Sequence, residues 1–173
     1  MTGEERRSKI LQLLKDQGTP LSGAALAQRF RVSRQIIVQD IALMRAESTP
    51  ILSTNRGYII RKEAAAASHP MRVFYVRHDT DQVLEEFMTI IELGGKILDV
   101  VVEHEIYGQI TCDLIIHSRQ DVDLFVQQCK DRNARGLSSL TSGVHYHTVE
   151  AVSEEILDRI EQELKQKGYL HII

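Results

Sequence analysis

Apolar residues recur at helical spacing in three segments near the start of the chain. The three stripes consist of Ile10, Leu13 and Leu14, then Leu26 and Phe30, then Ile37, Ile41 and Met44. Gly18 ends the first segment, and Ser22 and Ser33 precede the second and third, where a serine can cap a helix. The pattern predicts three helices. The short link between the last two, centred on Val32, is typical of a helix-turn-helix.

Two short β-prone segments follow the third helical stripe. Residues 51–53 and 58–60 flank Asn55, Arg56 and Gly57. Asn and Gly tolerate the positive φ angles that a tight hairpin needs. The pattern predicts a wing with Arg56 at its tip, where its guanidinium can contact a phosphate or enter the minor groove of DNA.

The rest of the chain alternates strand-like and helical patterns. Strands are expected at 72–78, at 96–118 as two strands with a turn near Gly108, at 144–151 and at 169–173. Helices are expected at 79–95, 119–132 and 153–168. The inward face expected for the first of these helices consists of Leu84, Phe87, Met88 and Ile91. Strands interrupted by helices, with hairpin-length links, favour an α+β open sandwich over a doubly wound sheet.

Charge divides the chain near the point where its composition changes. Residues 1–62 hold 11 Lys and Arg against 5 Asp and Glu, a balance of +6, and residues 63–173 hold 10 against 19, a balance of −9. We expect a winged helix-turn-helix domain at 1–62, an alanine-rich linker at 63–70 and a second domain at 71–173. The basic domain is expected to face a polyanion.

The overall composition is that of an ordinary globular chain, with 43 % apolar and 26 % charged residues. No apolar run is long enough to span a bilayer, and the first residues lack a signal-peptide pattern. We therefore expect a cytoplasmic protein with no membrane partner. Cys112 and Cys129 match no zinc or redox spacing.

The third helix is the expected DNA reader, since the second helix of a helix-turn-helix unit enters the major groove. The candidate DNA-binding residues are Arg34, Gln35, Val38, Gln39 and Arg45, with Arg56 in the wing. Arg and Gln can read guanine and adenine edges, respectively. The alternative is a small helical domain for protein contacts. Residues 4–62 resemble the winged helix-turn-helix of biotin-repressor-type regulators, most specifically in "SRQIIVQDIALMR".

Histidines and a glutamate in the second domain are candidate metal ligands. His145 and His147 alternate along a strand, so both imidazoles point to one face. His78 ends the first strand, and Glu86 lies about two turns into the following helix. The four side chains can converge on one divalent transition metal, and nickel, zinc, iron and manganese all suit such a set. A hydrogen-bonded structural cluster is the alternative.

Over essentially its whole length the chain resembles the niacin-responsive transcriptional repressors, which join a winged helix-turn-helix to a 3H domain. The resemblance rests on the spacing from His78 to Glu86, on "VVEHEIYG" and on "GVHYHTVEA". It implies that His78, Glu86, His145 and His147 bind a divalent metal. It also implies that nicotinic acid is the corepressor, and that the targets are operators of genes for NAD synthesis and niacin uptake. A homodimer would read a palindromic site.

Three further residues are candidates for contacts with the organic ligand. His104 and Tyr107 belong to the segment "VVEHEIYG", and Arg135 lies in a Ser/Gly-rich loop where it could receive a carboxylate. Each also has a plainer interpretation, as a hydrogen-bonded structural histidine, its neighbour and a solvated loop arginine.

Two other functions fit the same residues. The metal ion itself could be the effector, or the second domain could be a metal-dependent enzyme beside a DNA-binding domain. We expect no enzyme, because the second domain has no Gly-rich nucleotide loop and no activated Ser or Cys constellation.

Overall fold

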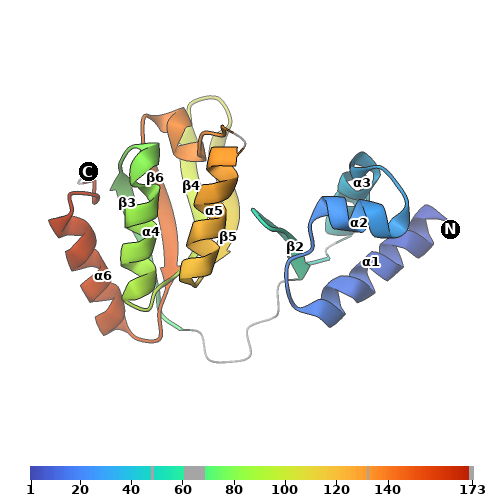
Figure 1. The fold of residues 1–173 in the computed structure, drawn as a ribbon, viewed down its shortest axis with the longest axis horizontal. Coiled ribbons are helices and arrows are strands. Elements are labelled where there is room, and N and C mark those ends of the chain that lie inside the picture. The colour runs from blue at the N-terminus through green and yellow to red at the C-terminus, as the bar shows by residue number, and fades with distance from the viewer. Residues whose placement is uncertain (48, 61–68, 132, 172–173) are drawn as a thin grey trace. The chain divides into compact units, whose positions relative to one another are not determined.

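The protein divides into two compact units (Figure 1). The structure, a computed structural model, describes residues 1–47, 49–60, 69–131 and 133–171. Met1–Ala65 form one unit and Ala66–Ile173 form the other. Most of the linker expected at 63–70 lies outside the described residues, which resume at 69.

Three helices and a hairpin make up the first unit. Their bounds are α1 Gly3–Gln17, α2 Gly23–Phe30, α3 Arg34–Ala46, β1 Ile51–Thr54 and β2 Gly57–Ile60. Ser22 Oγ accepts a hydrogen bond from the amide of Ala25 at 3.1 Å. Ser33 Oγ accepts one from the amide of Ile36 at 3.3 Å. Both expected caps are thus confirmed, and they start the two helices of the helix-turn-helix.

The core of this unit confirms the three apolar stripes. Its buried members are Ile10, Leu14, Leu26, Ala27, Ile37, Ile41, Met44 and Ile51. Leu13 and Phe30, which the pattern also placed inward, are half-buried and pack against this core. Burial of one stripe from each helix holds the three helices together, because apolar area removed from water stabilises the packed state.

An ion pair that the sequence did not reveal ties α1 to α3. Asp40 is 3 % exposed, and its carboxylate accepts from Arg6 Nε at 2.6 Å and from Arg6 Nη2 at 3.2 Å. Arg7 Nη1 lies 3.6 Å from the same carboxylate. The charge of Asp40 is therefore compensated on the inner side of α3, away from the exposed face.

The wing confirms the expected hairpin and gives Gly57 a different role. Asn55 and Arg56 form the turn, and Gly57 begins β2 with φ +135°. A Cβ at Gly57 would lie 2.2 Å from the carbonyl oxygen of Leu21. Leu21 and Tyr58 exchange two backbone hydrogen bonds of 2.9 Å. The glycine is needed because the wing presses against the segment before α2.

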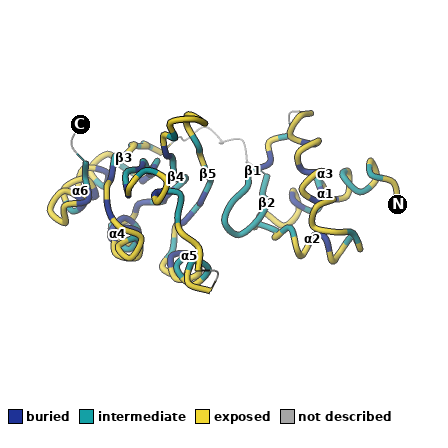
Figure 2. Tube along the Cα trace, turned by 90° about the horizontal axis from the view of Figure 1, so that it is seen from above, coloured by how far each residue is buried: buried dark blue, intermediate teal, exposed yellow. Residues whose placement is uncertain are grey.

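The second unit is a four-stranded antiparallel sheet with helices on one face (Figures 1 and 2). Its strands are β3 Met71–Arg77, β4 Lys96–His104, β5 Gly108–Ile116 and β6 Val144–Glu150, in the order β5-β4-β6-β3. Its helices are α4 Val83–Glu92, α5 Arg119–Asp131 and α6 Glu154–Gln166, with 3-10 segments at Thr80–Gln82 and Leu137–Thr141. Helix α4 packs against both α5 and α6. The α+β open sandwich is confirmed.

One local expectation for this unit was wrong, and a second is met in part. Leu84 is 41 % exposed, while Ile90 is fully buried. A 3-10 turn precedes α4, and the helix is rotated so that Glu86 and Phe87 face the sheet. Of the strand expected at 169–173, the described residues form one antiparallel bridge, between Val76 and Leu170. Residues 172 and 173 lie outside the described part of the chain.

Among the described residues, none of the helices combines the length and the apolar character that crossing a bilayer requires.

Candidate metal centre and DNA-binding surface

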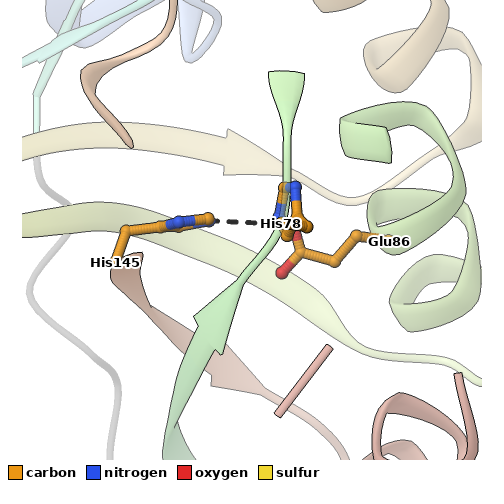
Figure 3. A group of neighbouring side chains, drawn as sticks. All are labelled: His78, Glu86 and His145. Atoms are coloured by element: carbon orange, nitrogen blue, oxygen red, sulfur yellow. Dashed lines mark hydrogen bonds and ion pairs between the residues drawn. The ribbon is translucent and has the colours of Figure 1, made fainter. Parts of the chain in front are cut away.

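The second unit brings His78, Glu86, His145 and His147 together beneath α4. Strands β3 and β6 pair with Val76 opposite His145 and Phe74 opposite His147. Because side chains alternate along β6, both imidazoles point to the face of the sheet that the helices cover. His78, directly after β3, and Glu86, on α4, lie on the same side. Figure 3 shows the side chains of His78, Glu86 and His145 pointing toward one another. All four side chains are buried, and none is more than 5 % exposed.

The carboxylate of Glu86 is the centre of the cluster. Glu86 Oε2 lies 2.7 Å from His78 Nε2, 3.6 Å from His147 Nε2 and 3.9 Å from His145 Nε2. Ligand atoms of His78, Glu86 and His145 all lie within 4.8 Å of one another. These separations are of the size found between ligands bound at about 2.0–2.2 Å to one small divalent ion.

Backbone carbonyls fix the orientation of all three imidazoles. His78 Nδ1 donates to the carbonyl of Asp79 at 2.9 Å, and His145 Nδ1 donates to that of Gly143 at 2.9 Å. His147 Nδ1 donates to the carbonyl of Asp99 at 2.7 Å. A proton held at Nδ1 leaves the lone pair at Nε2, the nitrogen that faces Glu86. This carbonyl support is the usual outer shell of histidine ligands in metal sites.

Charge and burial act in opposite directions on these groups. Burial raises the pKa of Glu86, but attraction to His147 and to the nearby nitrogens of His145 and His78 outweighs it and holds that pKa well below its usual value. Burial lowers the pKa of His145. For His78 and His147 the pKa is raised, because the nearby Glu86 carboxylate overcomes the effect of burial. The site thus favours an ionised carboxylate, which is the form that binds a metal.

Unpaired polar atoms in this cluster favour a cation. Glu86 Oε1 and His147 Nε2 are buried and have no hydrogen-bond partner among the described residues. A buried polar atom without a partner costs about 1–3 kcal/mol. An ion held by His78, Glu86 and His145 would lie near both atoms, so the residues present fit a divalent metal bound by imidazoles and one carboxylate, with His147, 3.6 Å from Glu86 Oε2, as the further candidate ligand.

Gly143 lets the chain before β6 approach His78 closely. Gly143 has φ +87°, and a Cβ there would lie 2.5 Å from the carbonyl oxygen of His78. The amide of His78 also donates to the carbonyl of Gly143 at 3.3 Å. Gly143 therefore places His78 as well as supporting His145.

We predict that Gly143→Ala weakens metal binding by about 10-fold or more, because moving an orienting partner costs about 10- to 100-fold in affinity. The strained φ adds about 1–3 kcal/mol of destabilisation. Titration calorimetry and thermal unfolding measure the two effects. Gly108→Ala is the matched control, with φ +69° and no atom within 4 Å of the added Cβ. Equal metal affinity in the two variants would contradict the role of Gly143.

Tyr169 is a second support that sequence reasoning missed. Its ring packs edge-on against His78 with centroids 5.5 Å apart, and its hydroxyl donates to Glu85 Oε2 at 2.8 Å. Burial and this hydrogen bond raise the pKa of Tyr169 to about 12. Its carbonyl accepts from the amide of Arg77 at 2.8 Å. The segment after α6 thus holds both the end of β3 and the helix that carries Glu86.

A cavity of about 520 Å³ opens beside the cluster. His145 and His147 form part of its wall, and Phe87 and Phe125 are among its mainly apolar lining residues. Lys130, at the end of α5, is exposed and lines the same cavity. The cavity is large enough for a small aromatic acid. Lys130 gave no signal in the sequence, because one lysine near a helix end is common on any surface.

The structure does not bring the other candidate ligand residues to this cavity. His104 lies at the end of β4, where its Nδ1 accepts from the amides of Ile106 and Tyr107 at 3.2 and 3.4 Å. Tyr107 is 76 % exposed in the β4–β5 turn. Arg135 lies between Ala134 and Gly136, which line the cavity, but it does not line the cavity itself.

The candidate DNA-binding residues of α3 form an exposed face. Arg34, Gln35 and Gln39 are exposed, and Val38 is 47 % exposed. They occupy the N-terminal part of the helix, opposite its buried stripe.

The other two candidate DNA-binding residues, Arg45 and Arg56, lie at or beside the wing. Arg45 donates from Nε to the carbonyl of Ile51 at 2.8 Å and from Nη2 to Ser53 Oγ at 2.8 Å, so its guanidinium ties α3 to the wing. Arg56 lies in the turn of the wing, with its amide donating to Thr54 Oγ1 at 3.2 Å. The Arg45 contact was invisible in the sequence, since it depends on how the hairpin folds back on α3.

Comparison with known proteins identifies both units. Residues 71–172 match the 3H domain family, and residues 6–59 match an HTH domain family. The chain is 40 % identical over 167 residues to "Probable transcription repressor NiaR" of Thermotoga maritima, covering 96 % of this chain and 94 % of that protein. It is 38 % identical over 172 residues to "Transcription repressor NadR" of Bacillus subtilis, covering 98 % and 95 %. An uncharacterized protein of Methanothermus fervidus is 32 % identical over 116 residues, which cover 63 % of this chain and 18 % of that protein.

The expectation that the chain is not an enzyme is supported by the two full-length relatives, which are named as repressors. Their similarity extends through both units, and the HTH match covers α2, α3 and most of α1 and of the wing. The chain belongs to the family of transcription repressors in which an HTH domain is followed by a 3H domain.

Proposed function

We propose that the protein represses genes for NAD synthesis and niacin uptake, with nicotinic acid as its corepressor and a divalent metal at the cluster of His78, Glu86, His145 and His147. The resemblance to niacin-responsive repressors suggests the effector and the genes. The observation that carries the proposal is the cavity beside the cluster, which has His145 and His147 in its wall and Lys130 on its lining.

Nicotinic acid has groups that suit each part of this cavity. Its ring fits the apolar walls, to which Phe87 and Phe125 contribute. A bound cation would offer an open coordination position to the pyridine nitrogen or to the carboxylate. With the nitrogen at the cluster, the carboxylate is free to pair with the ammonium of Lys130. Asp81 also lines the cavity, and its negative charge would repel a ligand carboxylate placed beside it.

The expected route from ligand to DNA runs through a homodimer. Two helix-turn-helix units joined by two-fold symmetry read a palindromic operator, with half-sites separated by whole helical turns of about 10 base pairs. A ligand that stabilises one spacing of the two units raises operator affinity. A coupling of about 1–3 kcal/mol corresponds to a change of about 5- to 150-fold.

Nicotinate should tighten operator binding by metal-loaded protein within this 5- to 150-fold range. Fluorescence anisotropy measures it, with a labelled duplex from upstream of the NAD-synthesis genes. Lys130→Ala should weaken nicotinate binding by about 10-fold, the worth of one charge-assisted hydrogen bond of about 1.5 kcal/mol, and leave metal affinity unchanged. Lys165→Ala, an exposed lysine on α6, is the control. Equal operator affinity with and without nicotinate would remove the corepressor.

One observation favours a second candidate, in which the metal itself is the effector. All four candidate ligands come from the protein and are buried, so the site can be completed without an organic molecule. Titration of the metal-free protein with metal alone separates the two candidates. Full repressor affinity before nicotinate is added would support the metal as effector.

A further inference from the structure

The face of the second unit's sheet that carries no helix is rich in apolar and aromatic side chains. Arg72 contacts Glu154, Asp158 and Glu161 of α6, so its odd-numbered neighbours on β3 point to the opposite face. Val73 on that face is 59 % exposed. We call this surface the open face, and its members used below are Val73, Tyr75, Arg77, Val101, Glu103 and Tyr146.

Aromatic stacking gives the open face a rigid centre. Tyr75 and Tyr146 are directly opposite in the β3–β6 register, and their rings stack with centroids 4.4 Å apart. A hollow of about 550 Å³ lies over them, between the β4–β5 turn and the 3-10 segment before β6. Ile106, which is 81 % exposed, and Leu140, which is 54 % exposed, line this hollow. Large side chains exposed together on one sheet face are typical of an interaction surface.

Charge on the open face is divided between its two sides. Arg77 lies on β3 at one edge of the sheet and is exposed. No ion pair of Arg77 occurs among the residues that the structure describes. Glu103 lies on β4, separated from β3 by β6, and Glu105 follows in the turn beside the hollow. The basic group and the acidic groups are therefore on opposite sides of the aromatic centre.

We propose that the open face is the dimer interface, and that its occupant is the open face of a second copy of this chain. A two-fold axis that runs along the strands between two stacked sheets places β3 of one copy over β5 of the other, and β6 over β4. Arg77 of each copy then lies over the acidic side of the other copy, near Glu103. The same operation lays Tyr146 against Val101, its cross-strand partner in β4.

This interface lies directly behind the candidate metal centre. Along β6, Tyr146 faces the open side, while His145 and His147 on either side of it face the cluster. A shift of β6 on metal or nicotinate binding would therefore move the centre of the interface and the spacing of the two DNA-reading units. This step rests on the proposed function, but the position of the interface does not.

Sedimentation equilibrium of the full chain, without DNA or nicotinate, tests the proposal. The wild-type chain is expected to be a dimer. Arg77→Glu and Glu103→Arg should each raise the dimer dissociation constant by about 10-fold or more, because each sets like charges against each other. The double variant should restore the wild-type constant to within about threefold, since it re-forms both pairs with reversed signs.

Two valine variants test the apolar part of the proposed interface. Val73→Glu should give monomers, whereas Val152→Glu should leave the dimer intact, although Val152 is 66 % exposed before α6. Circular dichroism checks that each variant is folded. A monomeric wild-type chain would overturn the proposal, as would a dimer that Arg77→Glu and Val73→Glu both leave unchanged. In that second case operator binding and its nicotinate response still test the proposed function separately.

Discussion

Glu86→Gln is expected to remove tight metal binding while the second unit stays folded. The change keeps the shape of the side chain and its ability to bond to His78, but it removes the charge that holds three imidazoles around one point. Loss of a partner that only orients a ligand costs about 10- to 100-fold in metal affinity, so loss of the carboxylate ligand should cost about 100-fold or more. Titration calorimetry with nickel, zinc or manganese measures this loss.

The same variant should also lose the nicotinate response, because the organic ligand is expected to meet the metal. Glu92→Gln is the matched control, since Glu92 is an exposed glutamate at the end of the same helix. It should bind metal and nicotinate like the wild-type chain. If Glu86→Gln keeps wild-type metal affinity, the cluster is a structural hydrogen-bonded group, and the nicotinate site needs another explanation.

Much of the first unit follows from local sequence. The serine caps, the apolar stripes and the hairpin depend on residues within a few positions of each other, and the structure places them as expected. What local patterns could not give are contacts between distant elements. Arg45 was expected at DNA, yet it bonds to Ile51 and Ser53 of the wing. An exposed arginine on a helix carries no sign of such a partner.

The candidate metal cluster could be predicted from the sequence for a physical reason. Two histidines at alternate strand positions must share a face, and a histidine at a strand end lies close to the helix that follows. The supporting groups were not accessible, because they act through the backbone. The carbonyl of Asp99 orients His147 from another strand, and Gly143 matters for its missing side chain. A backbone carbonyl and an absent side chain leave no mark in the spacing of residue types along the sequence.

The buried face of α4 could not be predicted from hydrophobic periodicity alone. Leu84 and Glu86 are two residues apart, so they cannot both face the core of one straight helix. Hydrophobicity alone favoured Leu84, but the structure buries Glu86 among three imidazoles and exposes Leu84. Glu86 is buried because the three imidazoles that compensate its charge are buried too. A paired carboxylate is the exception to the rule that carboxylates stay in water.

Asp40→Ala is expected to abolish operator binding at physiological temperature without changing metal binding. Its carboxylate is buried and compensates Arg6 and Arg7 of α1, so its removal leaves two cations beside an apolar core. Breaking a buried pair costs about 3–5 kcal/mol. The arginines are partly exposed here, and we expect about 2–3 kcal/mol, a large share of the stability of a domain this small.

Thermal unfolding and fluorescence anisotropy with the operator duplex measure the two consequences. Asp16→Ala is the control, because Asp16 is exposed on α1 and bonds only to Gln12 one turn away. Asp40→Asn should fall between the two, since it keeps one hydrogen-bond acceptor for Arg6 but loses the charge and the second acceptor. Helix α3 carries both Asp40 and the exposed face with the candidate DNA-binding residues. If Asp40→Ala loses DNA binding but keeps the wild-type melting temperature, residue 40 acts on DNA directly. The buried position of Asp40 argues instead that it acts by holding α3 against α1.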